Sequence, residues 1–240
     1  MIRGVLFDLD DTLFDHAGCA RAALTAVQNC HETLRAMSFE ALERTHAALL
    51  EELHKDVMLG RVPLEEARRQ RFARLLATCG DDTAGETAER LAATYRDAYR
   101  EVRRALPGAA GILAAVRRRE ARVGIVSNNL LEEQLDKLRT CGLDGLVDAL
   151  VVSEDVGISK PDPGIFHVAL DRLGIAPAEA VMVGDSWSAD VVGARAAGIR
   201  AVWFNPRRVA PPGDDAAIGQ LHALEPVARA MRIIFDAHRD

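Results

Sequence analysis

The sequence predicts an α/β protein in which a parallel sheet, with helices on both faces, carries an inserted α-helical bundle. Three observations predict this fold. Short apolar runs alternate with helical stretches in the second half of the chain, a pattern typical of parallel sheets covered on both faces. A long helical block interrupts this pattern directly after the first apolar run. Single glycines, which commonly follow the last turn of a helix, come after three of the helical stretches, at Gly142, Gly174 and Gly198.

The elements of the sheet core follow one another along the chain. Apolar runs predict five buried strands, at residues 3–7, 123–126, 150–152, 181–183 and 201–204. Helical stretches predict the connections and the C-terminal helix, at residues 109–119, 131–140, 164–173, 188–197 and 226–237. Residues 206–213 are rich in proline and glycine and are expected to form a loop. Because right-handed crossovers join parallel strands, we expect a Rossmann-like core.

The block of residues 17–104 differs from the rest of the chain. It is rich in Ala, Leu, Glu and Arg, shows no strand pattern, and is interrupted by Pro63 and Gly80. Leu106-Pro107-Gly108 closes the block like a linker. A chain of 240 residues has room for one core and a modest insertion. We therefore predict two domains, a core of residues 1–16 and 105–240 and a helical cap of residues 17–104.

Composition and charge narrow the range of partners. The net charge is -6, so the chain offers no basic field for a nucleic-acid backbone. No stretch approaches the ~20 apolar residues that cross a bilayer, and the first apolar run is too short for a signal peptide. The four cysteines are widely spaced and form no C-x-x-C pair, which favours free thiols over zinc or disulfides. We expect a cytoplasmic protein that binds neither nucleic acid nor membrane.

Polar residues gather where the predicted strands end. The four clusters are residues 8–12 (DLDDT), 127–129 (SNN), 159–163 (SKPDP) and 184–190 (GDSWSAD). Carboxyl ends of parallel strands meet at one edge, where ligands bind. Carboxylates gathered there repel one another unless a cation lies among them, and an all-oxygen ligand set favours Mg²⁺. A carboxylate can attack phosphorus, while a hydroxyl and a lysine can hold the phosphoryl group.

With these residues the sequence resembles the haloacid dehalogenase superfamily, in its phosphatase branch with an inserted helical cap, over nearly the whole chain. Four motifs carry the resemblance and occur in order at suitable strand ends. They are D-x-D-x-T at Asp8, Asp10 and Thr12, a strand ending in Ser127, Lys160 in the setting K-P-D-P, and G-D-x-x-x-x-D at Gly184, Asp185 and Asp190. Each motif alone is short enough to occur by chance, whereas the ordered set is specific.

The resemblance implies a Mg²⁺-dependent phosphatase that hydrolyses small phosphate monoesters through an aspartyl phosphate. Asp8 would be the nucleophile, and Asp10 the general acid and base. The implied magnesium ligands are Asp8, Asp185 and the main-chain carbonyl of Asp10. The local sequences FDLDDTLF and AVWFN point to nucleotide or sugar phosphates as the substrate class. The partner would be a small phosphorylated metabolite.

The remaining motif residues have implied roles around the phosphoryl group. Ser127, the amide of Asn128 and Lys160 would bind its oxygens, and Lys160 would also restrain Asp8. Thr12 would support the turn of the first motif, and Asp190 would hold the water shell of the metal. Residues 17–104 would act as a mobile lid over the site, with connections near residues 14–18 and 106–108.

Several site residues also have purely structural interpretations. Ser127 or Asp190 could cap the helix that follows it, and Trp187 could shape the substrate entrance or pack under the cap. Lys160 stands out because the chain has only three lysines against 27 arginines, which suggests a need for a compact ammonium. The histidines of the cap block are expected to be solvated or packed, and they include His16 and His46.

Other functions remain open at this point. A phosphomutase has the same core motifs, a dehalogenase would not be expected to keep an acid at Asp10, and a phosphonatase would need a reactive cap lysine, for which Lys55 is the candidate. A non-catalytic protein that binds a phosphorylated ligand would be expected to have lost a catalytic acid, and none is missing here. The oligomeric state is not predicted.

Overall fold

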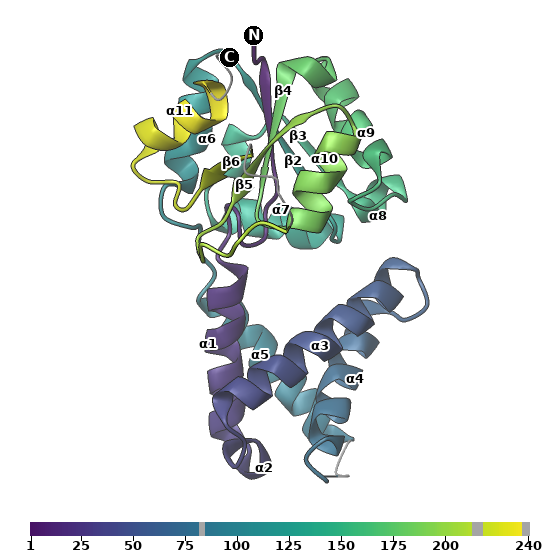
Figure 1. Cartoon of the computed structure of the whole chain (residues 1–240). Helices are drawn as coiled ribbons and strands as arrows, with labels where there is room; N and C mark the ends of the chain where they lie inside the picture. Colours follow the sequence, from purple (N-terminus) through teal and green to yellow (C-terminus); the bar gives the residue numbers. More distant parts are fainter. Residues whose placement is uncertain (82–84, 213–217, 237–240) are drawn as a thin grey trace. The chain divides into compact units, whose positions relative to one another are not determined.

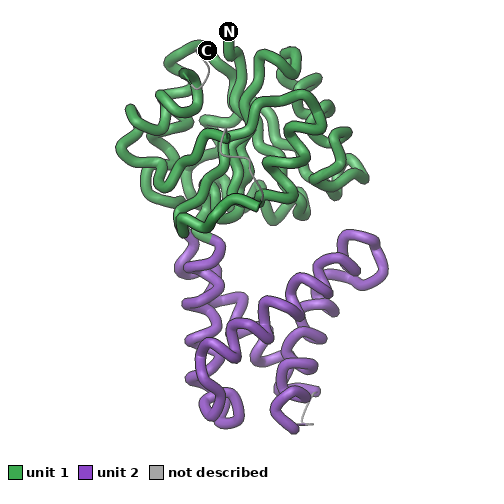
Figure 2. Tube along the Cα trace, viewed as in Figure 1, with its two compact units in different colours: residues 1–15, 104–240 green, residues 16–103 purple. Residues whose placement is uncertain are grey.

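The computed structural model describes residues 1–81, 85–212 and 218–236. The chain forms two compact units, shown in different colours in Figure 2. The first unit comprises Met1–Asp15 and Arg104–Asp240, and the second comprises His16–Arg103. Among the described residues, none of the helices combines the length and apolar character that crossing a membrane requires.

The first unit is built on a parallel sheet of six strands in the order β3-β2-β1-β4-β5-β6. The strands are β1 (Gly4–Phe7), β2 (Arg122–Ser127), β3 (Ala149–Val152), β4 (Ala180–Gly184), β5 (Arg200–Phe204) and β6 (Gly219–Leu221). The predicted fold class is therefore confirmed. The sequence did not predict β6, because its three residues, Gly-Gln-Leu, include no β-branched or aromatic side chain.

Helices cover both faces of this sheet (Figure 1). They are α6 (Ala109–Arg118), α7 (Leu131–Thr140), α8 (Ser153–Val156), α9 (Pro163–Leu173), α10 (Gly193–Ala196) and α11 (Val227–Asp236). Helices α6 and α11 lie on one side, and α9 and α10 on the other. On the α9 side a continuous core joins Leu6 of β1, Val126 of β2 and Met182 of β4 to Phe166 of α9. Both faces being buried explains why β1 reads as an uninterrupted apolar run.

The predicted helix at residues 188–197 has a different form from the one expected. A π-helical stretch runs over Trp187–Val192 and continues into the short helix α10. The hydroxyl of Ser186 accepts a hydrogen bond from the amide of Ala189 (3.2 Å) and so caps the stretch. The ends of two other predicted elements, Gly213 in the loop and Ala237 in the final helix, lie outside the described residues.

In the described part of the second unit, every regular element is a helix. The helices are α1 (His16–Cys30), α2 (Glu32–Arg35), α3 (Phe39–Met58), α4 (Leu64–Ala77) and α5 (Glu86–Glu101). Helix α1 packs on α5, and α4 packs on both α3 and α5. The core between them contains fully buried side chains from each long helix, among them Val27, Leu42, Phe72 and Leu91. Pro63 precedes the first residue of α4, where its missing amide hydrogen costs nothing.

The two chain segments that lead into and out of the helical unit pair with each other inside the first unit. The amide of Leu106 donates to the carbonyl of Leu13 (2.8 Å), and the amide of Asp15 donates to the carbonyl of Arg104 (3.1 Å). An antiparallel bridge joins Phe14 to Ala105. The side chains of Arg104 and Asp15 form an ion pair at 2.5 Å. These residues form a short antiparallel stem.

Gly108, close to this stem, has a backbone that a side chain would disturb. Its φ angle is 87°, and an added Cβ would lie 2.7 Å from Cγ of Glu225 and 3.1 Å from the backbone of Leu224. A substitution there would therefore strain the core itself.

Candidate active site

The first strand delivers Asp8 at the point where β1 ends, and the chain then turns tightly. The amides of Thr12, Leu13 and Phe14 all point to the carbonyl of Leu9, at 3.3, 3.0 and 2.9 Å. The turn needs a left-handed backbone at Asp11 (φ 59°), a conformation that aspartate tolerates better than most residues. Asp8 is buried, with 7% of its surface exposed. The turn explains why the motif can carry several acids within five residues.

Lys160 lies among the carboxylates as a buried cation. Its ammonium nitrogen is 2.6 Å from Oδ1 of Asp8, 2.6 Å from Oδ1 of Asp190 and 2.8 Å from the carbonyl oxygen of Val126. Burial opposes the charge of the ammonium, but Asp190 and Asp8 outweigh burial and raise the pKa of Lys160 above its usual value. Lys160 is therefore charged at every physiological pH.

Three carboxylates converge beside this lysine. Asp8, Asp185 and Asp190 each place one oxygen within 4.8 Å of the others. Burial raises the pKa of Asp8 well above its usual value, although Lys160 acts in the opposite direction. Burial, with help from Asp190 and Asp11, raises the pKa of Asp185 to about 7. The single ammonium thus leaves negative charge uncompensated, and an all-oxygen site of this kind fits Mg²⁺.

Asp190 is fixed by two partners and by the glycine opposite it. One of its oxygens contacts Lys160, and the other accepts the amide hydrogen of Ser186 at 2.9 Å. A Cβ on Gly184 would lie 2.3 Å from the Asp190 carboxyl group, so this position needs glycine. Ser186, rather than Asp190, caps the helical stretch that follows. The structure thus places Asp190 as the anchor of Lys160.

Thr12 links the first motif to the fourth. Its hydroxyl oxygen accepts the amide hydrogen of Asp185 at 3.1 Å, and it lies 3.5 Å from Oδ1 of the same residue. The contact reaches beyond the turn that Thr12 was expected to support. The indole of Trp203 donates to the carbonyl of Asp185 (2.8 Å). Trp187 stacks edge-on against Trp203 with ring centroids 5.0 Å apart, so it packs against the core.

Ser127 and Asn128 at the end of β2 contact different partners. The hydroxyl oxygen of Ser127 accepts a hydrogen bond from Nε2 of Gln134 at 2.6 Å. Leu130, not Ser127, precedes α7, so the capping interpretation of Ser127 is not what the structure shows. The Asn128 side chain exchanges two hydrogen bonds with the main chain of Lys160, at 2.8 and 2.7 Å. Asn128 thereby holds the Lys160 loop against β2.

Asp10 has a lysine of its own, which sequence reasoning missed. The ammonium of Lys137 lies 2.6 and 2.8 Å from the two carboxylate oxygens of Asp10. Nε2 of Gln134 and Nδ2 of Asn129 also donate to Asp10, at 2.9 and 3.1 Å. Lys137 is 4% exposed and Gln134 is fully buried. The scarcity of lysine that drew attention to Lys160 applied equally to Lys137, one turn after Gln134 on α7.

The acids of the site therefore form two groups. Asp8, Asp185 and Asp190 surround Lys160, whereas the side chain of Asp10 is held by donors from α7 and from the loop before it. Gln134 links Asp10 to the end of β2, because the same amide nitrogen contacts both Asp10 and Ser127. The arrangement separates a carboxylate that can attack from a carboxylate that can transfer a proton.

The amino-acid sequence is similar to those of known proteins. Residues 2–198 match the family of haloacid dehalogenase-like hydrolases. The chain is 32% identical to a glyceraldehyde 3-phosphate phosphatase of Methanothermobacter thermautotrophicus, over 85% of this chain and 86% of that enzyme. It is 40% identical to a phosphoserine phosphatase of Thermus thermophilus, a match that spans about half of each protein (57% of this chain and 55% of that enzyme).

Solved structures of the same fold are also similar. A HAD-hydrolase from Bacillus subtilis bound to magnesium superposes with a TM-score of 0.73 at 24% identity, covering 96% of this chain and 98% of that one. A 2-haloacid dehalogenase from Pseudomonas syringae superposes with a TM-score of 0.63 at 28% identity, with the same coverage.

Proposed function

Because the chain belongs to the haloacid dehalogenase-like hydrolases, we propose that it is a Mg²⁺-dependent phosphatase of small phosphate monoesters that works through an aspartyl phosphate on Asp8. The observation that carries the proposal is the convergence of Asp8, Asp185 and Asp190 within 4.8 Å, with Lys160 bonded to two of them. The names of the relatives agree with it, since they are phosphatases of phosphoserine and of glyceraldehyde 3-phosphate. We propose that the substrate is a nucleotide or sugar phosphate, or a metabolite of similar size.

The magnesium ligands that we propose are the carboxylates of Asp8 and Asp185 and the main-chain carbonyl of Asp10, with Asp190 holding the surrounding water. The ion would offset the charge of the phosphoryl group and of the nucleophile. The residues present fit this role, because the carboxylates outnumber the one ammonium among them and burial already disfavours their charge.

In the first step Asp8 attacks phosphorus, and the bond from phosphorus to the ester oxygen breaks. Lys160, the hydroxyl of Ser127 and the main-chain amide of Asn128 hold the phosphoryl oxygens. Ser127 already accepts a hydrogen bond from Gln134, so its own hydrogen can be donated to the substrate. Protonated Asp10 gives its proton to the departing oxygen.

In the second step Asp10, now a carboxylate, takes a proton from water. The resulting hydroxide attacks phosphorus, the bond from Asp8 to phosphorus breaks, and inorganic phosphate leaves. Lys137 and Gln134 keep the Asp10 carboxylate in one place between the two steps. A dehalogenase needs no proton donor at this position, so these contacts favour the phosphatase over the dehalogenase.

The test is phosphate release from a panel of phosphorylated metabolites with Mg²⁺, comparing the parent with Asp8→Asn. The amide is nearly isosteric but is a poor nucleophile, so turnover should fall by several orders of magnitude while the protein remains folded. Lys55→Met is the matched control, because Lys55 forms only an exposed ion pair with Glu51. Turnover by Asp8→Asn at the parent rate would exclude the aspartyl phosphate.

A further inference from the structure

A buried arginine in the helical unit pairs with none of the acids that the structure describes. Arg71 of α4 is 7% exposed, and its Nε is fully buried without a hydrogen-bond partner. Within residues 1–81, 85–212 and 218–236, no carboxylate lies within ion-pair distance of its guanidinium. The groups that act on its pKa, besides burial, are Tyr95 and Arg68, and neither of them is a carboxylate.

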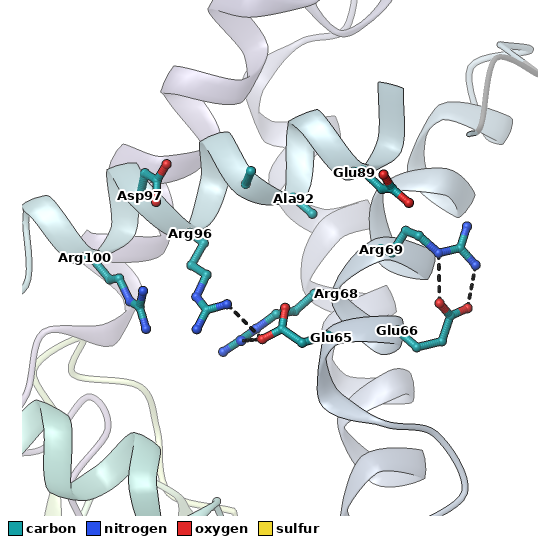
Figure 3. Close-up of a pocket in the computed structure, with 10 residues that line it drawn as sticks. Glu65, Glu66, Arg68, Arg69, Glu89, Ala92, Arg96, Asp97 and Arg100 are labelled. Carbon is teal, nitrogen blue, oxygen red and sulfur yellow. Dashed lines mark hydrogen bonds and ion pairs between the residues drawn. The ribbon is translucent and has the colours of Figure 1, made fainter. Parts of the chain in front are cut away.

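The neighbouring arginines of the same two helices are paired. Figure 3 shows Arg68 of α4 and Arg96 of α5 both directed at Glu65, with contacts of 2.6 and 2.8 Å. The hollow between the helices is lined by four acids and four arginines, so its charges balance. Arg71 lies on the same helix as Glu65 and Glu66, but these two acids pair with Arg68 and Arg69 instead.

Three aromatic rings lie near Arg71, and two of them, those of Tyr95 and His46, carry hydrogen-bonding groups. Its guanidinium carbon lies 4.9 Å from the ring centroid of Tyr95 and 5.3 Å from that of Phe72. The His46 ring lies 4.9 Å from Tyr95, and its Nε2 is buried without a partner. Burial and Arg71 hold the pKa of His46 well below its usual value, so the imidazole is neutral at pH 7. Burial raises the pKa of Tyr95 to about 12, so its phenol keeps its proton.

Packing alone does not account for a charge at this position. Taking an ion out of water without a partner costs several kcal/mol, whereas a desolvated cation over an aromatic ring gains about 2 kcal/mol. A leucine or methionine would fill the same space without the cost. The three side chains instead bring a guanidinium, an imidazole and a phenol together in the helical unit.

We propose that Arg71, His46 and Tyr95 bind the carboxylate group of a small molecule. A guanidinium can hold a carboxylate through two parallel hydrogen bonds, and the neutral imidazole and the phenol can add one bond each. A single carboxylate cancels the single buried charge, whereas a phosphate dianion would leave a net negative charge in the helical core. The ligand class is therefore a monocarboxylate.

The carboxylate could belong to the phosphorylated substrate or to a separate effector. The first source rests on the proposed function, and the second does not. Two pairs of phosphate esters distinguish them, because the members of each pair differ only in a carboxylate. They are O-phosphoserine with phosphoethanolamine, and 3-phosphoglycerate with glycerol 3-phosphate.

The activity experiment compares kcat/KM for each pair in the parent, in Arg71→Met and in the control Arg74→Met. Arg74 lies on the same helix but is exposed and paired with Glu52. If the substrate supplies the carboxylate, the parent should favour the carboxylate member by about 10- to 100-fold, the usual contribution of a charged hydrogen bond. Arg71→Met should remove the preference, and Arg74→Met should retain it. A preference that survives in Arg71→Met excludes the substrate as the source of the carboxylate.

Binding of glycerate, a phosphate-free carboxylate, provides an activity-independent readout, with glycerol as the uncharged control. Glycerate should raise the unfolding temperature of the parent and of Arg74→Met, but not that of Arg71→Met. Without ligand, Arg71→Met should unfold at the parent temperature or above it, because an unpaired charge has been removed. A clear loss of stability would mean that Arg71 is structural, and a parent that does not respond to glycerate and has no carboxylate preference would also overturn the proposal.

The two experiments separate the carboxylate site from the proposed function. If no ester in the panel releases phosphate while glycerate stabilises only the proteins that keep Arg71, the phosphatase proposal fails and the carboxylate site stands. If both members of each pair react equally but glycerate alters the turnover of glycerol 3-phosphate, the carboxylate is that of an effector.

Discussion

Replacing Lys160 by methionine should destabilise the metal-free protein strongly, because it removes the ammonium that pairs with two buried acids, Asp8 and Asp190. The ammonium contacts Asp8 and Asp190 at 2.6 Å each, and the side chain of Lys160 is 3% exposed. Removing one partner of a buried pair costs about 3–5 kcal/mol. At about 2–4 °C per kcal/mol for a protein of this size, the unfolding midpoint should fall by roughly 6–20 °C.

The assay is thermal unfolding in EDTA, followed by circular dichroism, with Lys55→Met as the control for loss of a surface lysine. The control should unfold like the parent, because its ion pair with Glu51 is 68% and 73% exposed. Mg²⁺ should restore part of the loss in Lys160→Met, since a cation can again offset the carboxylates. The loss should also shrink at low pH, where the acids are protonated.

One result would refute this reasoning. If Lys160→Met unfolds at the parent temperature at pH 8 without metal, the carboxylates do not depend on Lys160 for charge compensation. The kinetic effect should accompany the loss of stability. Both kcat and kcat/KM should fall, because Lys160 must offset the nucleophile and the phosphoryl group together. A rise in KM with kcat unchanged would make Lys160 a plain binding residue.

Three further predictions concern the metal and Asp10. The pKa of Asp185 is raised to about 7 from 3.8, so the folded metal-free protein keeps a proton that the unfolded chain releases, and stability should fall as pH rises from about 4 to 7. The stabilisation by Mg²⁺ should therefore grow over the same range of pH. An equal Mg²⁺-induced shift of the unfolding midpoint at pH 5 and pH 8 would contradict this role of Asp185. Chelation of the metal should abolish turnover, and Ca²⁺ should be a poor replacement for Mg²⁺. Asp10→Ala should still form the aspartyl phosphate from p-nitrophenyl phosphate and then stall, which would give a burst of about one equivalent of p-nitrophenol per enzyme. With an alkyl phosphate, whose leaving oxygen needs a proton, it should give no burst. Parent rates with both substrates would remove Asp10 from the mechanism. Lys137→Met should slow steady turnover of alkyl phosphates and of p-nitrophenyl phosphate alike, by about 10²-fold, because the Asp10 carboxylate that takes a proton from water loses its buried cation. Lys137→Arg should recover part of the rate, and parent rates with both esters would show that Lys137 does not act through Asp10.

The order of the elements and the edge at which the acids gather could be predicted from the sequence. Strands buried on both faces read as apolar runs, and the residues after them share one edge because the strands are parallel. Asp8, Ser127 and Asp185 follow β1, β2 and β4 for that reason. Strand β6 could not be found this way, because its pairing with β5, not its own composition, holds it in place.

The contacts that depend on helix rotation could not be predicted. On α7, Gln134 and Lys137 face the site, but a helical pattern of charged residues does not say which of them turns inward. The same holds for His46, which was expected to be solvated or packed, and for Arg71, for which the sequence indicated no role. Arg71 stands beside the fully buried Phe72, so its direction is decided by how α4 packs on α3 and α5.

The antiparallel stem at Leu13–Asp15 and Arg104–Leu106 makes the helical unit a detachable insertion. Because main-chain hydrogen bonds already hold the two ends together, joining Asp15 to Arg104 through a short turn would close a hairpin that the core contains anyway. The entropy of closing a loop grows only with the logarithm of its length, so a segment of very different size can occupy this position at little cost to the core. One helical module can therefore be exchanged for another at the stem, while the strand that precedes Asp8 keeps its pairing with the rest of the sheet.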